Sequence, residues 1–258
     1  MAYYTKLPIV LLSEIAAARE DSYRARMASY LLEHMGQSLT AEEIARDCFV
    51  SKSAVSRFCR EIGLEDFGEL KELLAKTDKN FERIGSDLSV EERFRQVAAR
   101  AADAMTRCAE TLDRATLSEL VRSIRTSERI ACFGLLKAEA AAINLQSDLT
   151  MLGLKALTKV SYKDQMDFLR ESVPSDLIIV FSYQGIYFEY DLPAEIREGH
   201  GKVFIVTGNP AAREKLLKRP LVKGVLCFSS DLDFISHPYQ LLAASSIIAQ
   251  EVAAKDKD

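Results

Sequence analysis

The sequence predicts an α/β protein built from two parts, an all-α helix-turn-helix domain followed by a doubly wound parallel α/β domain. The first 77 residues carry helical patterns throughout, with apolar side chains at spacings of three and four. Beyond Ser127 the period changes, and short β-rich runs alternate with helical segments. This alternation is typical of a parallel sheet whose crossover helices cover both faces. We therefore expect a helical domain at 1–77, a linker and connecting helix at 78–114, and the α/β domain at 115–258.

Composition bounds the class of protein. The chain has 258 residues, of which 48% are hydrophobic and 28% charged, which is ordinary for globular domains. A net charge of −4 argues against a protein that coats nucleic acid nonspecifically. The five cysteines are scattered without a C-x-x-C pair, so we expect buried thiols and no metal site or cofactor. The apolar run LPIVLL is too short to span a membrane, and we expect a cytoplasmic protein.

The helix-turn-helix is predicted between Leu39 and Lys71. Its first helix begins after Thr40, whose hydroxyl can form a capping box with Glu43 three residues later. Ala45 offers the small side chain that two closely crossing helices require. The turn falls on residues 48–50, and Ser51 is placed to cap the second helix.

The second helix has one apolar and one cationic face. Val55, Phe58, Cys59 and Ile62 form an apolar stripe, and Lys52 and Arg57 lie on the opposite side. A helix N-terminus with Lys52 favours phosphate, and Arg57 can contact a guanine edge through two hydrogen bonds. The alternative is an ordinary solvated helix face. The predicted DNA-binding residues are Thr40, Ser51, Lys52, Ser53, Ser56, Arg57 and Arg60.

This stretch resembles a known family. The run from Val50 to Leu64, VSKSAVSRFCREIGL, with Phe67 and Leu70-Lys71 after it, is similar to the N-terminal domain of RpiR-family bacterial transcription regulators. Phe49 departs from the family, whose turns carry a small residue able to adopt positive φ. We expect an altered turn here, with the Phe49 ring packed inside.

Other helices are expected on both sides of this motif. Their predicted ranges are 7–20, 22–35, 67–74, 93–112 and 116–125, the last capped by Thr116 with Glu119. The alanine- and arginine-rich helix at 93–112 either pairs with its copy in a dimer or packs on its own α/β domain.

Five strands are expected in the second half, at 130–133, 155–158, 177–181, 203–207 and 225–228. Helices are expected at 138–152, 163–171, 188–199, 210–217 and 238–254. In such a sheet a ligand lies beyond the carboxyl ends of the strands, where helix N-termini present free N–H groups. Two strand ends stand out, residues 133–137 and 181–185.

The second half, from about residue 115 to 254, resembles the sugar-isomerase (SIS) domain that RpiR-family regulators carry, a fold that binds phosphosugars. The likeness rests on the strand order, Gly134, Leu152-Gly153, the 176–182 strand with Gly185 and Glu189 after it, and Val206-Thr207. It implies a carbohydrate-derived effector, phosphorylated or not.

The effector loops depart from the family pattern. Leu136 and Ala138 replace a glycine and a serine, and Gln184 and Tyr187 replace a serine and a threonine. The lost hydroxyls would have donated hydrogen bonds to phosphate. In their place we expect Lys137 to supply a charge, Gln184 a neutral polar edge and Tyr187 a stacking face. The predicted ligand-binding residues are Lys137, Ser182, Tyr183, Gln184, Gly185 and Tyr187.

The sequence therefore predicts a DNA-binding transcriptional regulator, and not an enzyme, that controls carbohydrate metabolism genes. Its expected partners are double-stranded operator DNA, a sugar-derived effector and a second copy of itself, because one helix-turn-helix reads few base pairs. A homodimer or a higher homo-oligomer satisfies this need. Two alternatives stay open: an SIS-type phosphosugar isomerase or lyase, and a regulator whose SIS domain is only a dimerisation scaffold.

Overall fold

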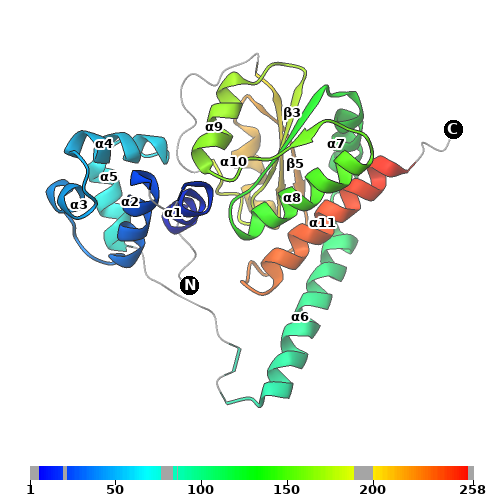
Figure 1. Ribbon diagram of the computed structural model, residues 1–258. Helices are drawn as coiled ribbons and strands as arrows, with labels where there is room; N and C mark the ends of the chain where they lie inside the picture. Colours follow the sequence, from blue (N-terminus) through cyan, green and yellow to red (C-terminus); the bar gives the residue numbers. More distant parts are fainter. Residues whose placement is uncertain (1–5, 20–21, 77–83, 86, 189–199, 255–258) are drawn as a thin grey trace. The chain divides into compact units, whose positions relative to one another are not determined.

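The computed structural model describes residues 6–19, 22–76, 84–85, 87–188 and 200–254. As far as they are described, these residues form two compact units (Figure 1). One unit comprises residues 1–81 with 160–167 and 188–192, and the other contains the rest of the chain.

The helical unit contains α1 (Lys6–Ala17), α2 (Tyr23–Glu33), α3 (Ala41–Asp47), α4 (Lys52–Glu61) and α5 (Phe67–Lys76). The capping box at α3 is confirmed, because the Thr40 hydroxyl accepts a hydrogen bond from the Glu43 N–H at 3.2 Å and the Glu43 carboxylate accepts one from the Thr40 N–H at 2.7 Å. The Ser51 cap is also confirmed, since its hydroxyl accepts from the Ala54 N–H at 3.2 Å. The core of the unit includes Leu31, Ile44, Ala45, Val55, Phe58, Cys59, Ile62, Leu70 and Leu74.

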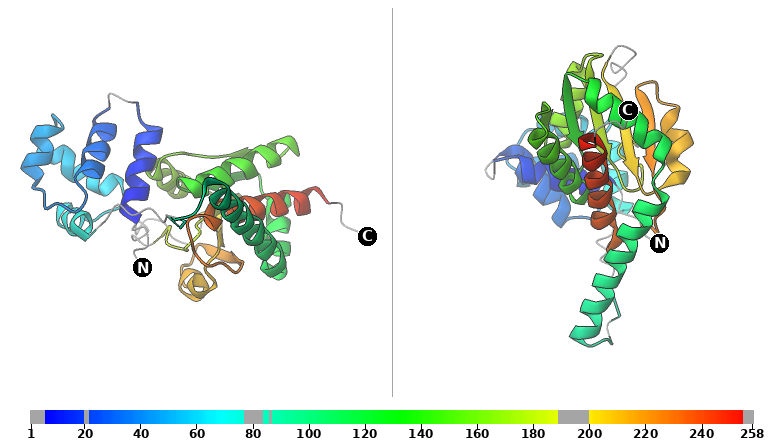
Figure 2. Two further views of the ribbon diagram at one scale, coloured as in Figure 1. Left: turned by 90° about the horizontal axis from the view of Figure 1, so that it is seen from below. Right: turned by 90° about the vertical axis from the view of Figure 1, so that its right-hand side faces the viewer.

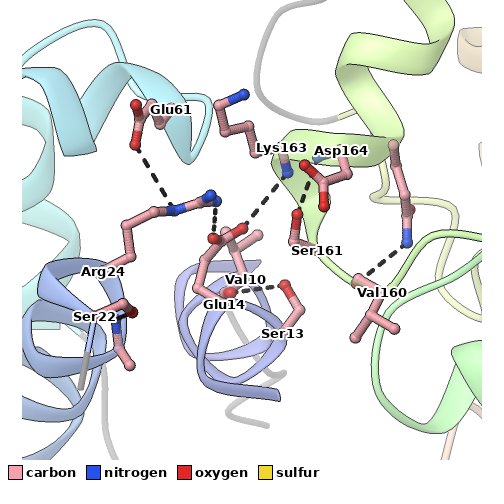
Figure 3. A network of polar contacts seen from close by, with 12 residues as sticks. Val10, Ser13, Glu14, Ser22, Arg24, Glu61, Val160, Ser161, Lys163 and Asp164 are labelled. Carbon is pink, nitrogen blue, oxygen red and sulfur yellow. Dashed lines mark hydrogen bonds and ion pairs between the residues drawn. The ribbon is translucent and has the colours of Figure 1, made fainter. Parts of the chain in front are cut away.

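An ion pair with a buried carboxylate joins α1 to α2 (Figure 3). The Glu14 side chain on α1 is fully buried, and its carboxylate pairs with the Arg24 guanidinium on α2. The Lys163 backbone N–H also points at this carboxylate, 3.5 Å away. Burial raises the pKa of Glu14, and the nearby Arg24 charge opposes this shift. The pair therefore compensates a charge that water cannot reach.

Removing Arg24 should therefore destabilise the helical unit. We expect Arg24→Met to lower the free energy of unfolding by about 3 kcal/mol, because it leaves the Glu14 carboxylate buried and unpaired. Adding Glu14→Gln should recover part of this loss. Urea denaturation of the single and double variants measures both effects, and equal stability of parent and Arg24→Met would contradict this account of the pair.

The α/β unit has five parallel strands in the order β2-β1-β3-β4-β5. They are β1 (Arg129–Phe133), β2 (Ala156–Leu157), β3 (Asp176–Phe181), β4 (Lys202–Thr207) and β5 (Val222–Cys227). Every residue of the central strand β3 is buried, as a sheet covered on both faces requires. The predicted doubly wound fold is confirmed.

Helices cover both faces of this sheet (Figure 1). One face packs against α7 (Arg114–Thr126), α8 (Lys137–Met151) and α11 (Ser236–Ala253), and α6 (Val90–Thr111) packs on α11. The other face meets α9 (Tyr162–Glu171), where the Phe133 and Phe168 rings touch edge to face, and α10 (Arg213–Leu217) after the short η1 (Pro210–Ala212). Residues 189–199, within a predicted helix, lie outside the described residues.

Two helices begin earlier than predicted because of their caps. Helix α6 begins at Val90, three residues earlier than expected, because Ser89 and Glu92 form a capping box. Helix α7 is capped by Asp113 and not by Thr116, since the Asp113 carboxylate accepts the Ala115 and Thr116 N–H groups at 3.1 and 3.3 Å. The helix therefore begins about one turn before the expected cap and already includes Thr116.

Strand β2 is shorter than predicted and lies at the edge of the sheet. It pairs with β1 only at Ile130 and Ala131. Further along β1, the Thr158 hydroxyl donates a 2.7 Å hydrogen bond to the Cys132 carbonyl. A side chain thus replaces the next bond of the ladder.

Candidate DNA-binding and effector sites

Helix α4 presents the predicted polar face to solvent. Its apolar stripe is buried in the core, which includes Val55 and Phe58 at 1% and 0% exposure. The opposite face, comprising Ser51, Lys52, Ser53, Ser56, Arg57 and Arg60, is exposed. Thr40 is exposed one helix earlier, with its hydroxyl held by the capping box. The structure therefore brings the candidate DNA-binding residues to one surface.

Acidic side chains next to this face hold some of the cations. Lys52 pairs with Glu42, and the hydrogen bond from Lys52 lowers the pKa of Glu42. The Arg57 guanidinium lies 4.0 Å from the Glu61 carboxylate and also over the Tyr23 ring. Arg60 has no ion-pair partner among the described residues. Because the Lys52 and Arg57 pairs are exposed, they cost little to exchange for phosphate or a base edge.

The turn before α4 differs from the prediction at Phe49. The expected inward packing is wrong, because this ring is 86% exposed. The backbone keeps the turn that the family's small residue would make, with φ +54°. The Val50 N–H bonds to the Ala45 carbonyl at 2.9 Å and the Phe49 N–H to the Arg46 carbonyl at 3.2 Å. These two bonds define a Schellman motif, and the left-handed residue of that motif directs its side chain away from the helix end.

The same motif ends α4 and α8 with glycine. Gly63 has φ +89° and Gly153 has φ +83°, and each is followed by a leucine N–H that bonds back into the helix. A left-handed conformation costs a residue with a Cβ about 1–2 kcal/mol relative to the right-handed one. Phe49 therefore carries a strain that the chain avoids at the two equivalent positions.

The effector loops lie at the carboxyl ends of β1 and β3. In the β3 loop the Ser182 hydroxyl accepts the Tyr187 N–H at 3.1 Å, and Gly185 has φ +77°. A Cβ added at Gly185 would lie 2.7 Å from the Ala212 Cβ, so the loop packs tightly against η1. The Asn209 amide donates a 3.0 Å hydrogen bond to the Gln184 carbonyl. The loop is thus held from several sides.

Two predicted ligand residues have buried rings. Tyr183 is 3% exposed and Tyr187 is 4% exposed, so Tyr187 does not offer the stacking face expected from the sequence. The Tyr183 hydroxyl contacts the Ser230 hydroxyl and donates to the Gln240 amide oxygen at 2.8 Å. Its ring stacks on His237, with centroids 4.3 Å apart. Tyr183 therefore connects the β3 loop to the start of α11.

The β1 loop keeps a strained backbone. Leu136, where the family has glycine, has φ +53°. Lys137 begins α8 and donates a 2.9 Å hydrogen bond to the Phe234 carbonyl. Burial lowers the pKa of Lys137, and Asp233 opposes the shift. Strain of this kind persists where the surrounding structure fixes the loop, and it concentrates at ligand sites.

A polar cavity of about 340 Å³ lies next to these contacts. Its walls come from α6 and from the segment that leads into α11, and Gln240 belongs to both the cavity and the Tyr183 contact. Sequence patterns do not identify this cavity, because its two walls are more than 100 residues apart. The lining residues are Arg100, Asp103, Ala104, Arg107, Asp231, Asp233, Ser236 and Gln240.

Neither a metal-binding group of side chains nor a membrane-spanning helix is found in the part of the chain that the structure describes. No group of three or more His, Cys, Asp or Glu side chains is arranged to hold a metal ion among these residues. No described helix is both long and apolar enough to cross a membrane.

Comparisons with known proteins agree with this architecture. Residues 21–80 match the family described as "Helix-turn-helix domain, rpiR family". The chain is 26% identical to the uncharacterized HTH-type transcriptional regulator YfhH of Escherichia coli K12 over 196 aligned residues, which are 71% of this chain and 69% of that protein. It is 24% identical over 219 residues to the HTH-type transcriptional regulator HexR of Pseudomonas aeruginosa, which covers 80% and 77%.

Solved structures share the fold of the second unit. A putative sugar-phosphate isomerase from Listeria monocytogenes superposes with a TM-score of 0.53 at 15% identity, over 66% of this chain and 91% of that one. A protein from Escherichia coli CFT073 gives a TM-score of 0.51 at 11% identity, over 64% and 92%. The chain thus joins a helix-turn-helix to an SIS-like α/β fold. Residues 21–80 thus carry a helix-turn-helix of the rpiR family, in a chain that is similar to HTH-type transcriptional regulators over most of its length.

The buried His237 should make stability depend on pH. Burial lowers its pKa to about 3 from an ordinary 6.5, and its Nε2 atom has no hydrogen-bond partner among the described residues. Below pH 6.5 the unfolded chain binds a proton that the folded chain excludes. The free energy of unfolding therefore falls by about 1 kcal/mol for each unit by which the pH is lowered. His237→Leu should flatten this slope in urea denaturation at pH 7 and pH 5. Equal slopes for parent and variant would contradict the prediction.

Proposed function

We propose that this regulator binds operator DNA through the exposed face of α4 and controls carbohydrate metabolism genes in response to a sugar-derived metabolite. The observation that carries the proposal is the arrangement of α4, whose apolar stripe is buried while its cationic face is exposed. In a helix-turn-helix the second helix enters the major groove with its N-terminal residues on the base edges. Helix α4 is that second helix, and α3 would cross the backbone.

The residues of this face take different roles in the proposal. Arg57 contacts a guanine edge, and Lys52 and the α4 N-terminus contact phosphate. Arg60 adds a phosphate contact, since no described carboxylate competes for it. The remaining contacts come from hydroxyls of Thr40, Ser51, Ser53 and Ser56, which hydrogen-bond to phosphate or base edges.

A homodimer or a higher homo-oligomer is the assembly we propose. Two copies present two recognition helices to related half-sites, which supplies the specificity that one helix lacks. Helix α6 favours this, because its N-terminal half projects from the rest of the α/β unit (Figure 2). Val90, Phe94 and Met105 on it are 49%, 71% and 43% exposed. Apolar side chains in such numbers on one helix are typical of an interface.

The effector is proposed to bind at the carboxyl edge of the sheet. An SIS-like fold binds its ligand where helix α8 and the β3 loop begin, and a carbohydrate derivative needs several hydrogen-bonding groups there. Lys137 supplies charge, and the strained Leu136 backbone supports a loop that is held for a ligand. The proposed ligand-binding residues are Lys137, Ser182, Tyr183, Gln184, Gly185 and Tyr187.

Two other functions have some support. A scaffold role for the SIS-like domain is favoured by the β3 loop, where Ser182 and Tyr187 satisfy each other and both tyrosine rings are buried. A phosphosugar isomerase is favoured by the fold alone. Isomerisation needs a matched acid and base, which the predicted residues do not include. Binding to the DNA upstream of its own gene, beside an isomerase assay on sugar phosphates, separates a regulator from an enzyme.

Substitutions on α4 test the DNA-binding role. Arg57→Ala should weaken specific operator binding by about 1–3 kcal/mol and relax specificity, because it removes a base-edge contact. Lys52→Ala should weaken specific and random DNA nearly equally, since phosphate contacts carry no sequence information. Fluorescence anisotropy over a range of salt concentrations measures both effects. If both variants bind the operator as tightly as the parent at moderate salt, α4 is not the recognition helix.

Lys137 tests the effector site. A thermal-shift screen of sugars, amino sugars and their phosphates should give a ligand that stabilises the parent, and Lys137→Met should reduce this shift for phosphorylated ligands. Lys202→Met is the matched control, because Lys202 is an exposed lysine at the start of β4, on the opposite edge of the sheet. An equal loss in both variants would place the site elsewhere. No ligand across a broad panel would favour the scaffold role.

A further inference from the structure

We propose that the Phe49 side chain is a DNA contact that recognises the methyl group of a thymine beside the bases read by α4. This inference rests on the proposed function, because it needs α4 in the major groove. It adds an apolar specificity contact from the turn to the polar contacts of the helix.

Folding of the helical unit does not account for a phenylalanine at this position. The ring is 86% exposed, so it contributes little to the core. The backbone is left-handed, a conformation that disfavours every side chain with a Cβ. Gly63 makes the same turn at the end of the next helix, where a Cβ would also lie 2.9 Å from the Tyr162 ring. Both the burial and the backbone of residue 49 thus disfavour phenylalanine in the free protein.

Phe49 lies next to the N-terminal end of the DNA-binding face in the chain. It lies two residues before Ser51, the N-cap of α4, so its Cα is within about 7 Å of the Ser51 Cα. Arg46 and Lys52, three residues away on either side, are exposed cations whose ion pairs with Asp47 and Glu42 are also exposed and can be exchanged for phosphate. An apolar ring between two such cations suits a surface that combines phosphates with apolar groups.

Duplex DNA offers one apolar group of this kind in the major groove, the C5-methyl group of thymine. Phenylalanine is among the side chains that contact it. The Schellman hydrogen bonds fix the backbone of residue 49, so the Cα–Cβ bond already points outward before binding. The strain stored in the turn therefore positions a contact that α4 cannot make with its own side chains.

The test relies on opposite preferences at position 49, because stability of the fold favours glycine and DNA binding favours phenylalanine. Phe49→Gly should raise the melting temperature of the full chain, since it relieves the left-handed strain, and should weaken DNA binding about fivefold by removing an apolar contact. Phe49→Leu should keep most of the affinity without the gain in stability. The probe is the duplex that the parent protein selects from a random-sequence pool, with binding measured by fluorescence anisotropy.

Replacing thymine with deoxyuracil in that duplex removes only the methyl groups. One such replacement should weaken the parent about as much as Phe49→Gly does, and it should not weaken Phe49→Gly further. A Phe49→Gly protein that binds as tightly as the parent would overturn the proposal. It would also be overturned if, at every thymine, replacement with deoxyuracil weakened Phe49→Gly as much as it weakens the parent.

Arg57→Ala distinguishes this failure from a failure of the proposed function. If Arg57→Ala weakens binding and Phe49→Gly does not, α4 still recognises DNA and the Phe49 contact is wrong. If neither variant weakens binding, the assignment of α4 is wrong as well. A change in oligomeric state of Phe49→Gly by light scattering, with unchanged affinity per site, would assign the ring to a contact between copies and overturn the DNA contact.

Discussion

The arrangement of the helical unit depends on one chain reversal, the three-residue turn between α3 and α4. The turn closes because the Val50 N–H bonds back to the Ala45 carbonyl, and this bond requires a left-handed residue between the two helices. Ala45 is 8% exposed at the crossing, where a larger side chain would push the helices apart. Once the reversal is fixed, α4 can bury its apolar stripe in one orientation, and that orientation determines which side chains face outward.

Most of the helical unit follows from local patterns that a sequence displays directly. The capping box at Thr40, the cap at Ser51 and the buried stripe with Phe58 all depend on residues within one or two turns of each other. Phe49 shows where such reasoning fails. An apolar residue in a turn suggests burial, but the backbone hydrogen bonds of the helix end determine the direction of its side chain. The misplaced cap of α7 has a similar cause, since two residues could cap one helix and the sequence does not rank them.

In the α/β unit, too, some features are predictable from local sequence and others are not. Its strands were predictable because buried parallel strands are continuous apolar runs, and alternation with helices determines the parallel order. The two loops proposed to bind the effector follow the ends of β1 and β3, as the sequence predicts, but the directions of their side chains were not predictable. Tyr183 turns toward Gln240, 57 residues later, and no local pattern encodes that choice. The polar cavity is harder still, because Arg107 and Asp231 meet there through an ion pair between distant elements.

The short edge strand β2 has a consequence for how copies of this chain can associate. An unpaired strand edge can add a strand from another molecule, and long flat edges lead to aggregation. Here the two-residue β2 offers almost no edge, and the Thr158 hydroxyl occupies the next carbonyl of β1. The sheet is therefore closed to extension on this side, so a second copy cannot associate here by adding a strand.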